Sequence, residues 1–417
     1  MSSELVWTTA LNLPGFEVVA ATVEQAQRVI RLTVVPGHPV AVCPHCGDVC
    51  RDVHQTRDLE AVRDLPLADR AVELVVRVAQ WWCATCRRAF TPPIPGLAEG
   101  TPATERFLTR AADLIRHGDV TRAAEFLRVP EKTLERWYYD GVERQQQQRP
   151  AVPITRIGID ELSLKKSTEK KHRQFVCVIV DHTNRRVLEV LESREKGVVV
   201  KFLQDSQATG LLAQVTEVTS DMWDGDVTAA REVFGASAVV TIDRFHVMQN
   251  LQEQLTAARR EIQRDLPREE ARELKGSRWL WLTNPENLDD AQRQRLATLK
   301  SQFPRLAQLA DQREALRQLF EDRSLTTAAA GFARLTQWLS AARALGLSAL
   351  NQFCDTLERW QDKIANYFVS RSSNGPTEGF NNGLRTILRR SFGMLNFRHF
   401  RLRVLDLFGR PRPQEST

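Results

Sequence analysis

The segment Ile154-Thr-Arg-Ile-Gly-Ile-Asp160 is a short apolar run that ends in a carboxylate. A second run, from Val215 to Ser220, is followed in the same way by Asp221. Short runs of this kind, rich in β-branched residues, are typical of buried strands. We therefore predict that each segment is a strand and that each strand delivers a carboxylate at its end.

The elements around these runs predict a multidomain α/β protein. Three strands in succession are followed by alternating helices and strands, which is the order of a ribonuclease-H-like sheet. In that order the strands that end at Asp160 and Asp221 lie side by side and parallel, so both carboxylates reach one edge of the sheet. The expected strands span residues 154–160, 173–181, 186–192, 214–220 and 238–243, and the expected helices lie near 196–207 and 226–234.

A third acid, Glu378, lies far downstream in the segment Ser373-Asn-Gly-Pro-Thr-Glu-Gly-Phe-Asn-Asn382. Phosphodiester cleavage by two Mg²⁺ ions requires hard oxygen ligands that converge on ions about 4 Å apart, and carboxylates meet that need. We therefore interpret Asp160, Asp221 and Glu378 as one candidate metal site. An alternative stays open, because an aspartate at a strand end often caps the helix that follows, as Asp221 can do.

Two further residues are accessory candidates. Asp243 also ends an expected strand and is a rival for the second acid, but Asp221 is favoured because its strand follows the crossover helix and should pair with the first strand. His246 can orient a phosphate or donate a proton, although a histidine of the core or of a helix cap fits the sequence equally well. Glu161, next to Asp160, is interpreted as a bystander.

The composition bounds the class of protein. The formal net charge is +6 and the pI is about 9.0, which permits a polyanionic partner. No apolar run approaches the roughly 20 residues of a membrane span, and the N-terminus lacks a signal-peptide layout. The chain has seven cysteines, an odd number that favours a reducing compartment and metal ligation over disulfides. We expect a cytoplasmic protein without a membrane partner.

Two Cys-x-x-Cys pairs, Cys43/Cys46 and Cys83/Cys86, predict a structural zinc site. Four thiolates complete a tetrahedral Zn²⁺ ion and leave no open position for catalysis. The segment around 72–80 is expected to be a strand that carries the second pair back to the first. The alternative is a set of reduced, buried thiols, and the neighbouring Cys50, His45 and His54 are interpreted as bystanders.

Residues 119–137 have the pattern of a helix-turn-helix, with small residues where two helices cross. On the second helix Thr133, Arg136 and Tyr139 are candidates to reach DNA. The acids Glu131 and Glu135 on the same helix weaken a base-reading role, and an ordinary helical hairpin is the alternative.

The segment from 244 to about 370 is rich in Leu, Ala, Gln, Arg and Glu and predicts a long helical insertion. Trp279 and Trp281 near its start are interpreted as core residues, with stacking on a flipped base as the alternative for at most one of them. The segment after Glu378 is strongly basic. Its candidates for contact with the phosphate backbone are Arg385, Arg389, Arg390 and Arg401.

These motifs occur in a fixed order that resembles bacterial insertion-sequence transposases of the ISL-three family, which carry an Asp-Asp-Glu catalytic domain. The most specific parts are Asp243-Arg-Phe-His246 and the segment 373–382, which continues into Arg389-Arg390-Ser-Phe-Gly393. The resemblance covers nearly the whole chain. It departs from the family pattern within 222–235, where a tyrosine usual near Asp226 is absent and Gly235 stands where a proline is usual.

The resemblance implies that Asp160, Asp221 and Glu378 are the catalytic acids and bind two Mg²⁺ or Mn²⁺ ions. It implies a transposase that binds terminal inverted repeats in double-stranded DNA, cleaves the element ends and joins 3′-hydroxyls to target DNA. The expected acting form is a homodimer on paired ends, and the expected location is the bacterial nucleoid. The alternatives are a catalytically silent, domesticated regulator and a nuclease of the same fold without strand transfer.

The expected domain organisation has six parts. A β-rich zinc-binding domain spans 1–95 and a helix-turn-helix domain spans 100–148, after a proline-rich linker. The catalytic domain is split by the helical insertion, and the chain ends in a tail expected to be disordered. The remaining boundaries are 152–246 and 371–409 for the two catalytic parts, 247–370 for the insertion and 410–417 for the tail.

Overall fold

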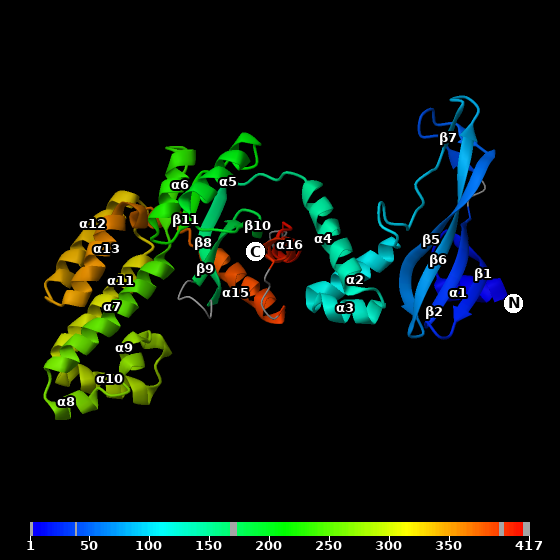
Figure 1. The fold of residues 1–417 in the computed structure, drawn as a ribbon. Helices are drawn as coiled ribbons and strands as arrows, with labels where there is room; N and C mark the ends of the chain where they lie inside the picture. The colour runs from blue at the N-terminus through cyan, green and yellow to red at the C-terminus, as the bar shows by residue number, and fades with distance from the viewer. Residues whose placement is uncertain (1–2, 38–39, 167–172, 392–395, 412–417) are drawn as a thin grey trace. The chain divides into compact units, whose positions relative to one another are not determined.

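The computed structural model describes residues 3–37, 40–166, 173–391 and 396–411 (Figure 1). These form two compact units: residues 1–149 with 389–394, and residues 150–388 with 395–417. Most of the tail predicted to be disordered, 412–417, lies outside the described residues, as do Phe392 and Gly393 of the basic motif.

The first unit is built on a five-stranded sheet in which β1, β2, β6 and β5 are neighbours in that order and β7 pairs with β6. Alternating residues such as Leu32, Val34, Leu74 and Val76 are buried and form its core. The N-terminal residues differ from the β-rich prediction, because they form a helix whose Trp7 packs against this core. The bounds are α1 Ser3–Leu11, β1 Phe16–Glu24, β2 Val29–Pro36, β5 Val53–Leu67, β6 Arg70–Cys83 and β7 Arg88–Phe90.

Three helices follow in the same unit: α2 (Glu105–His117), α3 (Val120–Leu127) and α4 (Glu131–Gln147). The side chains of Thr104 and Asp119 cap α2 and α3 by accepting backbone N–H groups of the first turn. A short turn, opened by Arg128 in the left-handed region at φ 53°, joins α3 to α4. The three helices thus follow one another within residues 105–147, and a tight turn separates α3 from α4.

The second unit contains a five-stranded mixed sheet with the order β10-β9-β8-β11-β12. The strands β8, β9 and β10 are antiparallel neighbours, and β11 runs parallel to both β8 and β12. Strands and helices follow in the predicted sequence. The bounds are β8 Arg156–Lys166, β9 Arg173–Asp181, β10 Arg186–Leu191, α5 Lys196–Ala208, β11 Glu217–Ser220, α6 Asp224–Phe234 and β12 Val239–Ile242.

The prediction that the first strand ends at Asp160 is wrong. The strand β8 continues to Lys166, because it stays paired with β9 after its pairing with β11 stops at Gly158. Buried Leu162 on the extension maintains the alternating pattern. Asp160 therefore lies inside β8, just beyond the carboxyl end of the neighbouring strand β11.

Helices fill the chain between β12 and the third acid, and they share one hydrophobic core with the sheet. Helices α12 and α13 pack side by side, and α13 also packs on α7 and β12 (Figure 1). None of the described helices is both long and apolar enough to span a membrane. The bounds are α7 Arg244–Asp265, α8 Arg268–Glu273, α9 Arg278–Leu282, η1 Pro285–Asn287, α10 Asp290–Gln302, α11 Pro304–Glu321, α12 Ala328–Arg343, α13 Ser348–Ala365 and α14 Tyr367–Ser370.

The last two helices, α15 (Gly375–Arg390) and α16 (Phe397–Phe408), return to the sheet. Helix α16 packs on β10, where the Arg401 guanidinium donates to the Glu189 carboxylate, with Nε 2.6 Å from Oε1. Helix α15 carries Glu378 in its first turn.

Candidate active site and metal centres

Asp160 occupies the middle of the sheet and is 5% exposed. Its Oδ1 accepts the backbone N–H of Glu161 at 2.7 Å, and its Oδ2 accepts from the Asn381 amide nitrogen on α15 at 2.9 Å. The Asn381 contact is a direct bond between the strand of the first acid and the helix of the third.

Close packing against Gly158 seats the start of α15 on the sheet. A Cβ atom at this position would lie 2.3 Å from His182 Nε2, 2.4 Å from Thr377 Oγ1 and 2.5 Å from Asn374 Oδ1. His182 and Thr377 also form a hydrogen bond of 2.8 Å. Burial lowers the pKa of His182 to about 4, so the ring is neutral at physiological pH. Glycine is therefore required here for the close approach of the helix.

The segment that leads into α15 is held by buried polar groups. Asn374 donates to the Ile159 carbonyl at 3.1 Å and accepts from the Thr219 hydroxyl at 3.1 Å, so it spans β8 and β11. The Ser372 hydroxyl donates to the buried carboxylate of Glu217 on β11 at 2.7 Å. These contacts hold the first turn of α15 over two neighbouring strands.

The rival acids Asp221 and Asp243 differ in their surroundings. Asp243 is 2% exposed and caps α7, where its Oδ1 accepts the Phe245 N–H at 3.3 Å; it also accepts the backbone N–H of Asn374. By contrast, the buried Oδ1 of Asp221 has no hydrogen-bond partner in the described part of the chain. Asp243 is engaged in holding structure, whereas Asp221 has an oxygen free for a ligand.

The acids lie close enough to influence one another. Burial and, to a smaller extent, the charges of Asp221 and Glu378 raise the pKa of Asp160 to about 6, against the lowering effect of the Glu161 N–H and His246. Burial likewise raises the pKa of Asp221, and His246 opposes the shift. Asp160, Asp221, Glu378 and His246 thus belong to one electrostatic cluster, although they come from distant segments.

This cluster fits hard cations. Buried carboxylate oxygens that lack partners are costly unless a cation or donors compensate them. Among the described residues, the three acids do not converge as tightly as ligands of a single ion, because only a cysteine group has three or more ligand atoms within 4.8 Å of one another. A wider spread is compatible with acids that serve two neighbouring ions.

The cysteine group consists of Cys43, Cys46, Cys83 and Cys86. The Sγ atoms of Cys43 and Cys86 are 3.9 Å apart, and those of Cys46 and Cys83 are 3.6 Å apart. A tetrahedron with Zn–S bonds of about 2.3 Å has sulfur–sulfur edges of about 3.8 Å, so the spacing fits zinc and excludes disulfides. Cys50 instead contacts the Asp48 carbonyl, while His45 and His54 are exposed.

The predicted DNA contacts have unequal support. Arg136 is exposed and Thr133 is half-buried on α4, but Tyr139 is 1% exposed within the core of the helices, which argues against a DNA contact. Arg385, Arg389 and Arg390 are exposed on α15. The Arg401 guanidinium is engaged by Glu189, so its role here is to hold α16 on the sheet.

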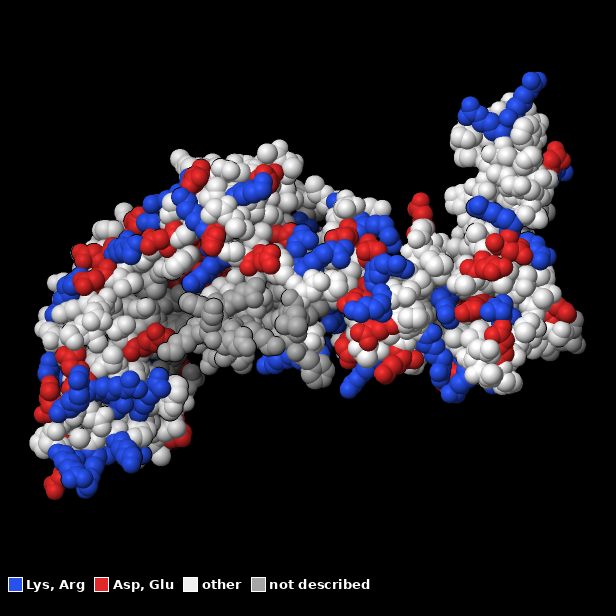
Figure 2. Space-filling view, viewed as in Figure 1, with Lys and Arg blue, Asp and Glu red and all other residues white. Residues whose placement is uncertain are grey.

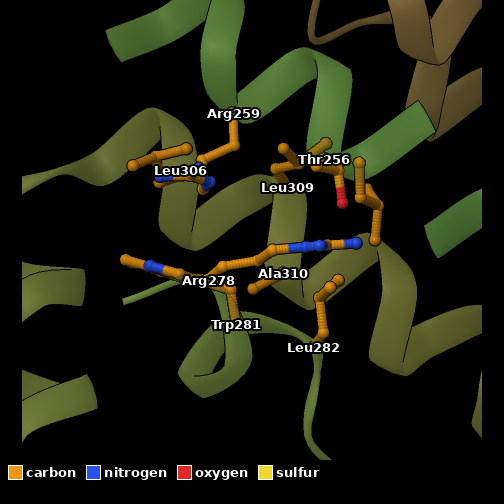
Figure 3. A pocket seen from close by; sticks show the side chains of 9 residues that line it. Thr256, Arg259, Arg278, Trp281, Leu282, Leu306, Leu309 and Ala310 are labelled. Carbon is orange, nitrogen blue, oxygen red and sulfur yellow. The ribbon is translucent and has the colours of Figure 1, made fainter. Parts of the chain in front are cut away.

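The two tryptophans of α9 differ in exposure, because residues two apart on a helix lie on different faces. Trp281 is 7% exposed and its Nε1 donates to the Ser277 hydroxyl at 3.1 Å. It lines a small cavity of about 20 Å³ together with Arg259 and Arg278 (Figure 3). Trp279 is 66% exposed and lies against the Arg278 guanidinium. The core interpretation holds for Trp281 but not for Trp279.

Sequence reasoning missed several residues of the site. Asn374 and Asn381 stand inside the quoted segment 373–382, so their amides beside Glu378 were a readable signal. His182, Glu217 and Asp226 lie outside any motif, and only the packing of distant segments reveals them.

Comparison with known proteins supplies independent evidence. A family model described as a transposase, of the Asp-Asp-Glu, ISL-three type, matches residues 157–404. The chain is 26% identical over 392 residues to the transposase for insertion sequence element IS1001 of Bordetella parapertussis, covering 92% of this chain and 93% of that protein. It is 28% identical over 265 residues to the transposase for IS1557 of Mycobacterium tuberculosis, covering 58% and 57%.

A solved structure, the Drosophila P element transposase strand transfer complex, aligns with 72% of this chain and 90% of its own, at 12% identity and a TM-score of 0.36. This similarity is too low to support a structural argument. The family match covers more than half of the chain and includes all three candidate acids. The chain belongs to the ISL-three family of insertion-sequence transposases.

Proposed function

We propose that this chain binds the terminal inverted repeats of an insertion sequence, cleaves the element ends by metal-dependent phosphodiester hydrolysis and transfers the 3′-hydroxyl ends to target DNA. The observation that carries the proposal is the electrostatic cluster of Asp160, Asp221 and Glu378, near the point where β11 ends beside β8. The strand order β10-β9-β8-β11-β12, with β9 antiparallel, supports a ribonuclease-H-like catalytic domain.

The three acids would hold two Mg²⁺ or Mn²⁺ ions. When bound, such ions activate the attacking oxygen and stabilise the leaving oxygen. Asp160 is kept in place by the Asn381 amide, and Asp221 presents an oxygen without a partner. Glu378 is accessible to a substrate, since its side chain is 38% exposed, and the Arg385 guanidinium lies 3.4 Å from its carboxylate on the same helix.

Two accessory roles follow for neighbouring residues. Asp243 is proposed to position Asn374, and thereby α15, rather than to bind metal directly. His246 lies within the field of Asp160, Asp221 and Asp243 and is proposed to orient a phosphate or to pass a proton.

DNA recognition is assigned to the first unit. The four-cysteine group would bind one structural Zn²⁺ ion and fix the end of the long strands β5 and β6. The exposed face of α4, with Thr133 and Arg136, is the proposed recognition surface.

A second contact with the phosphate backbone is proposed for the helical region of the second unit. Figure 2 shows Lys and Arg side chains gathered at the end of the helical region that holds α8, α9 and the close of α7. Six cations of residues 260–278 are exposed and make no ion pair within the described residues: Arg260, Arg264, Arg268, Arg272, Lys275 and Arg278. Unpaired cations on one surface attract phosphate and make binding depend on salt.

Two copies of the chain are proposed to act together, because transposition must process both ends of the element. The test is incubation of purified protein with a labelled terminal-repeat duplex and Mg²⁺ or Mn²⁺. Nicking at the repeat boundary followed by joining to a second duplex would support the proposal. Tight binding without cutting would favour a domesticated regulator, and cutting without joining would favour a nuclease.

A further inference from the structure

A second group of carboxylates lies beside the candidate site, on helix α6. Asp226 is 0% exposed, and neither of its oxygens has a hydrogen-bond partner among the described residues. It shares a buried face with Ala230 and Phe234, so helix periodicity turns it toward the sheet. The neighbouring acid Asp224 points outward instead and pairs with Arg359.

The groups that face Asp226 are mainly acidic. Burial, together with the charges of Asp221, Glu161 and Asp160, raises the pKa of Asp226 to about 8. Arg194 is the cation that opposes this shift, but its guanidinium is already bound to Glu161 Oε2 at 2.6 Å and lies over the rings of Phe175 and Trp223.

Buried oxygens without partners therefore come from three acids that influence one another electrostatically. They are Oε1 of Glu161, Oδ1 of Asp221 and both Oδ atoms of Asp226. Among the described residues the ligand atoms of these acids do not gather within 4.8 Å of one another, so ion-bound water would have to complete a shared site. An unpartnered carboxylate in a protein interior is costly, and a cation offsets that cost when several oxygens share it. The thiol of Cys177, which β9 places opposite Glu161, has its pKa raised by burial and by these acids, so it stays neutral and is not a competing ligand.

We propose that Asp226, together with Glu161, is a further carboxylate of the metal centre and binds, directly or through ion-bound water, a divalent cation shared with Asp221. The inference rests on the proposed function, since it extends the same centre. Oxygen ligands favour a hard cation such as Mg²⁺ or Mn²⁺. Glu161, interpreted from the sequence as a bystander, takes part through the oxygen that Arg194 leaves free.

The test is a titration of the full-length protein with Mn²⁺ alone, in which free Mn²⁺ is followed by electron paramagnetic resonance. Asp226→Asn keeps the side-chain shape and removes the charge, and it is expected to weaken Mn²⁺ binding about tenfold or more. Glu161→Gln should act in the same direction. The matched control is Asp224→Asn, which removes an exposed acid from the same helix and should leave the affinity unchanged.

Asp221→Asn separates this inference from the proposed function. If Asp221→Asn weakens Mn²⁺ binding while Asp226→Asn and Glu161→Gln stay within twofold of the wild type, the inference is wrong and the proposed centre stands. If Asp221→Asn also binds like the wild type, the centre itself is wrong. Circular dichroism confirms that each variant is folded. In metal-free buffer Asp226→Asn should melt at a higher temperature, because it removes a buried carboxyl whose ionised form is repelled by the neighbouring acids.

Discussion

Gly158→Ala tests how α15 is positioned. The new Cβ would lie 2.3 to 2.5 Å from polar atoms of His182, Thr377 and Asn374, where contacts shorter than 3.0 Å are essentially never found. All three neighbours are tied into hydrogen bonds, so the start of α15 must move. Overpacking of this kind costs about 1–3 kcal/mol, and each kcal/mol lowers Tm by about 2–4 °C in a unit of this size.

The movement also separates Glu378 from Asp160. A displacement of about 1 Å in a catalytic group can reduce the rate about a hundredfold. The assays are thermal unfolding and cleavage of a labelled terminal-repeat duplex. The matched control is Gly379→Ala on α15, where a Cβ would meet no atom within 4 Å; alanine there should raise stability by about 0.5–1 kcal/mol. Gly158→Ala protein that melts and cuts like the wild type would refute this account of how α15 is positioned.

Three other predictions follow from the structure. Cys83→Ser should release zinc and abolish repeat binding while the second unit still melts as in the wild type; retained zinc by metal analysis would contradict the four-cysteine site. Without metal, the second unit should lose stability as pH rises from about 4 to about 8. The folded pKa values of Asp160 (about 6) and Asp226 (about 8) exceed the ordinary aspartate pKa of 3.8, so the folded state binds extra protons in that window. In thermal melts Asp226→Asn should remove the loss above pH 6. Arg136→Ala should weaken repeat binding and reduce the slope of log affinity against log salt concentration by about one unit, without changing Tm. Arg401→Ala should lower Tm instead, because Arg401 holds α16 to Glu189. Equal Tm values for the two variants would contradict the assignment of Arg136 to DNA binding and Arg401 to stability.

The sheet of the second unit could be predicted because each strand carries its own signal. The apolar runs at 154–160 and 215–220 lie in or beside β8 and β11, and the connecting helices follow in the expected order. The two cysteine pairs were predictable for the same reason, since two thiols three residues apart form a local motif. Signals of this kind do not depend on which segments meet in space.

Other features depend on tertiary packing and could not be read from one sequence. Tyr139 was taken for a DNA contact because helix periodicity alone does not say which aromatic enters the core. The sequence predicts a phosphate contact for Arg401, but its partner Glu189 lies far away in the sequence on β10. The same holds for Asp226, whose burial depends on how α6 rests on the sheet.

The central claim is that Asp160, Asp221 and Glu378 form the centre that cuts DNA. The most direct measurement is metal-dependent nicking of a terminal-repeat duplex by the wild type beside Asp221→Ala, Glu378→Ala and Asp243→Ala. The account predicts that nicking is lost in Asp221→Ala and Glu378→Ala while both variants still bind the repeat, and that Asp243→Ala lowers stability as well as activity. Nicking that persists in Asp221→Ala would contradict the account.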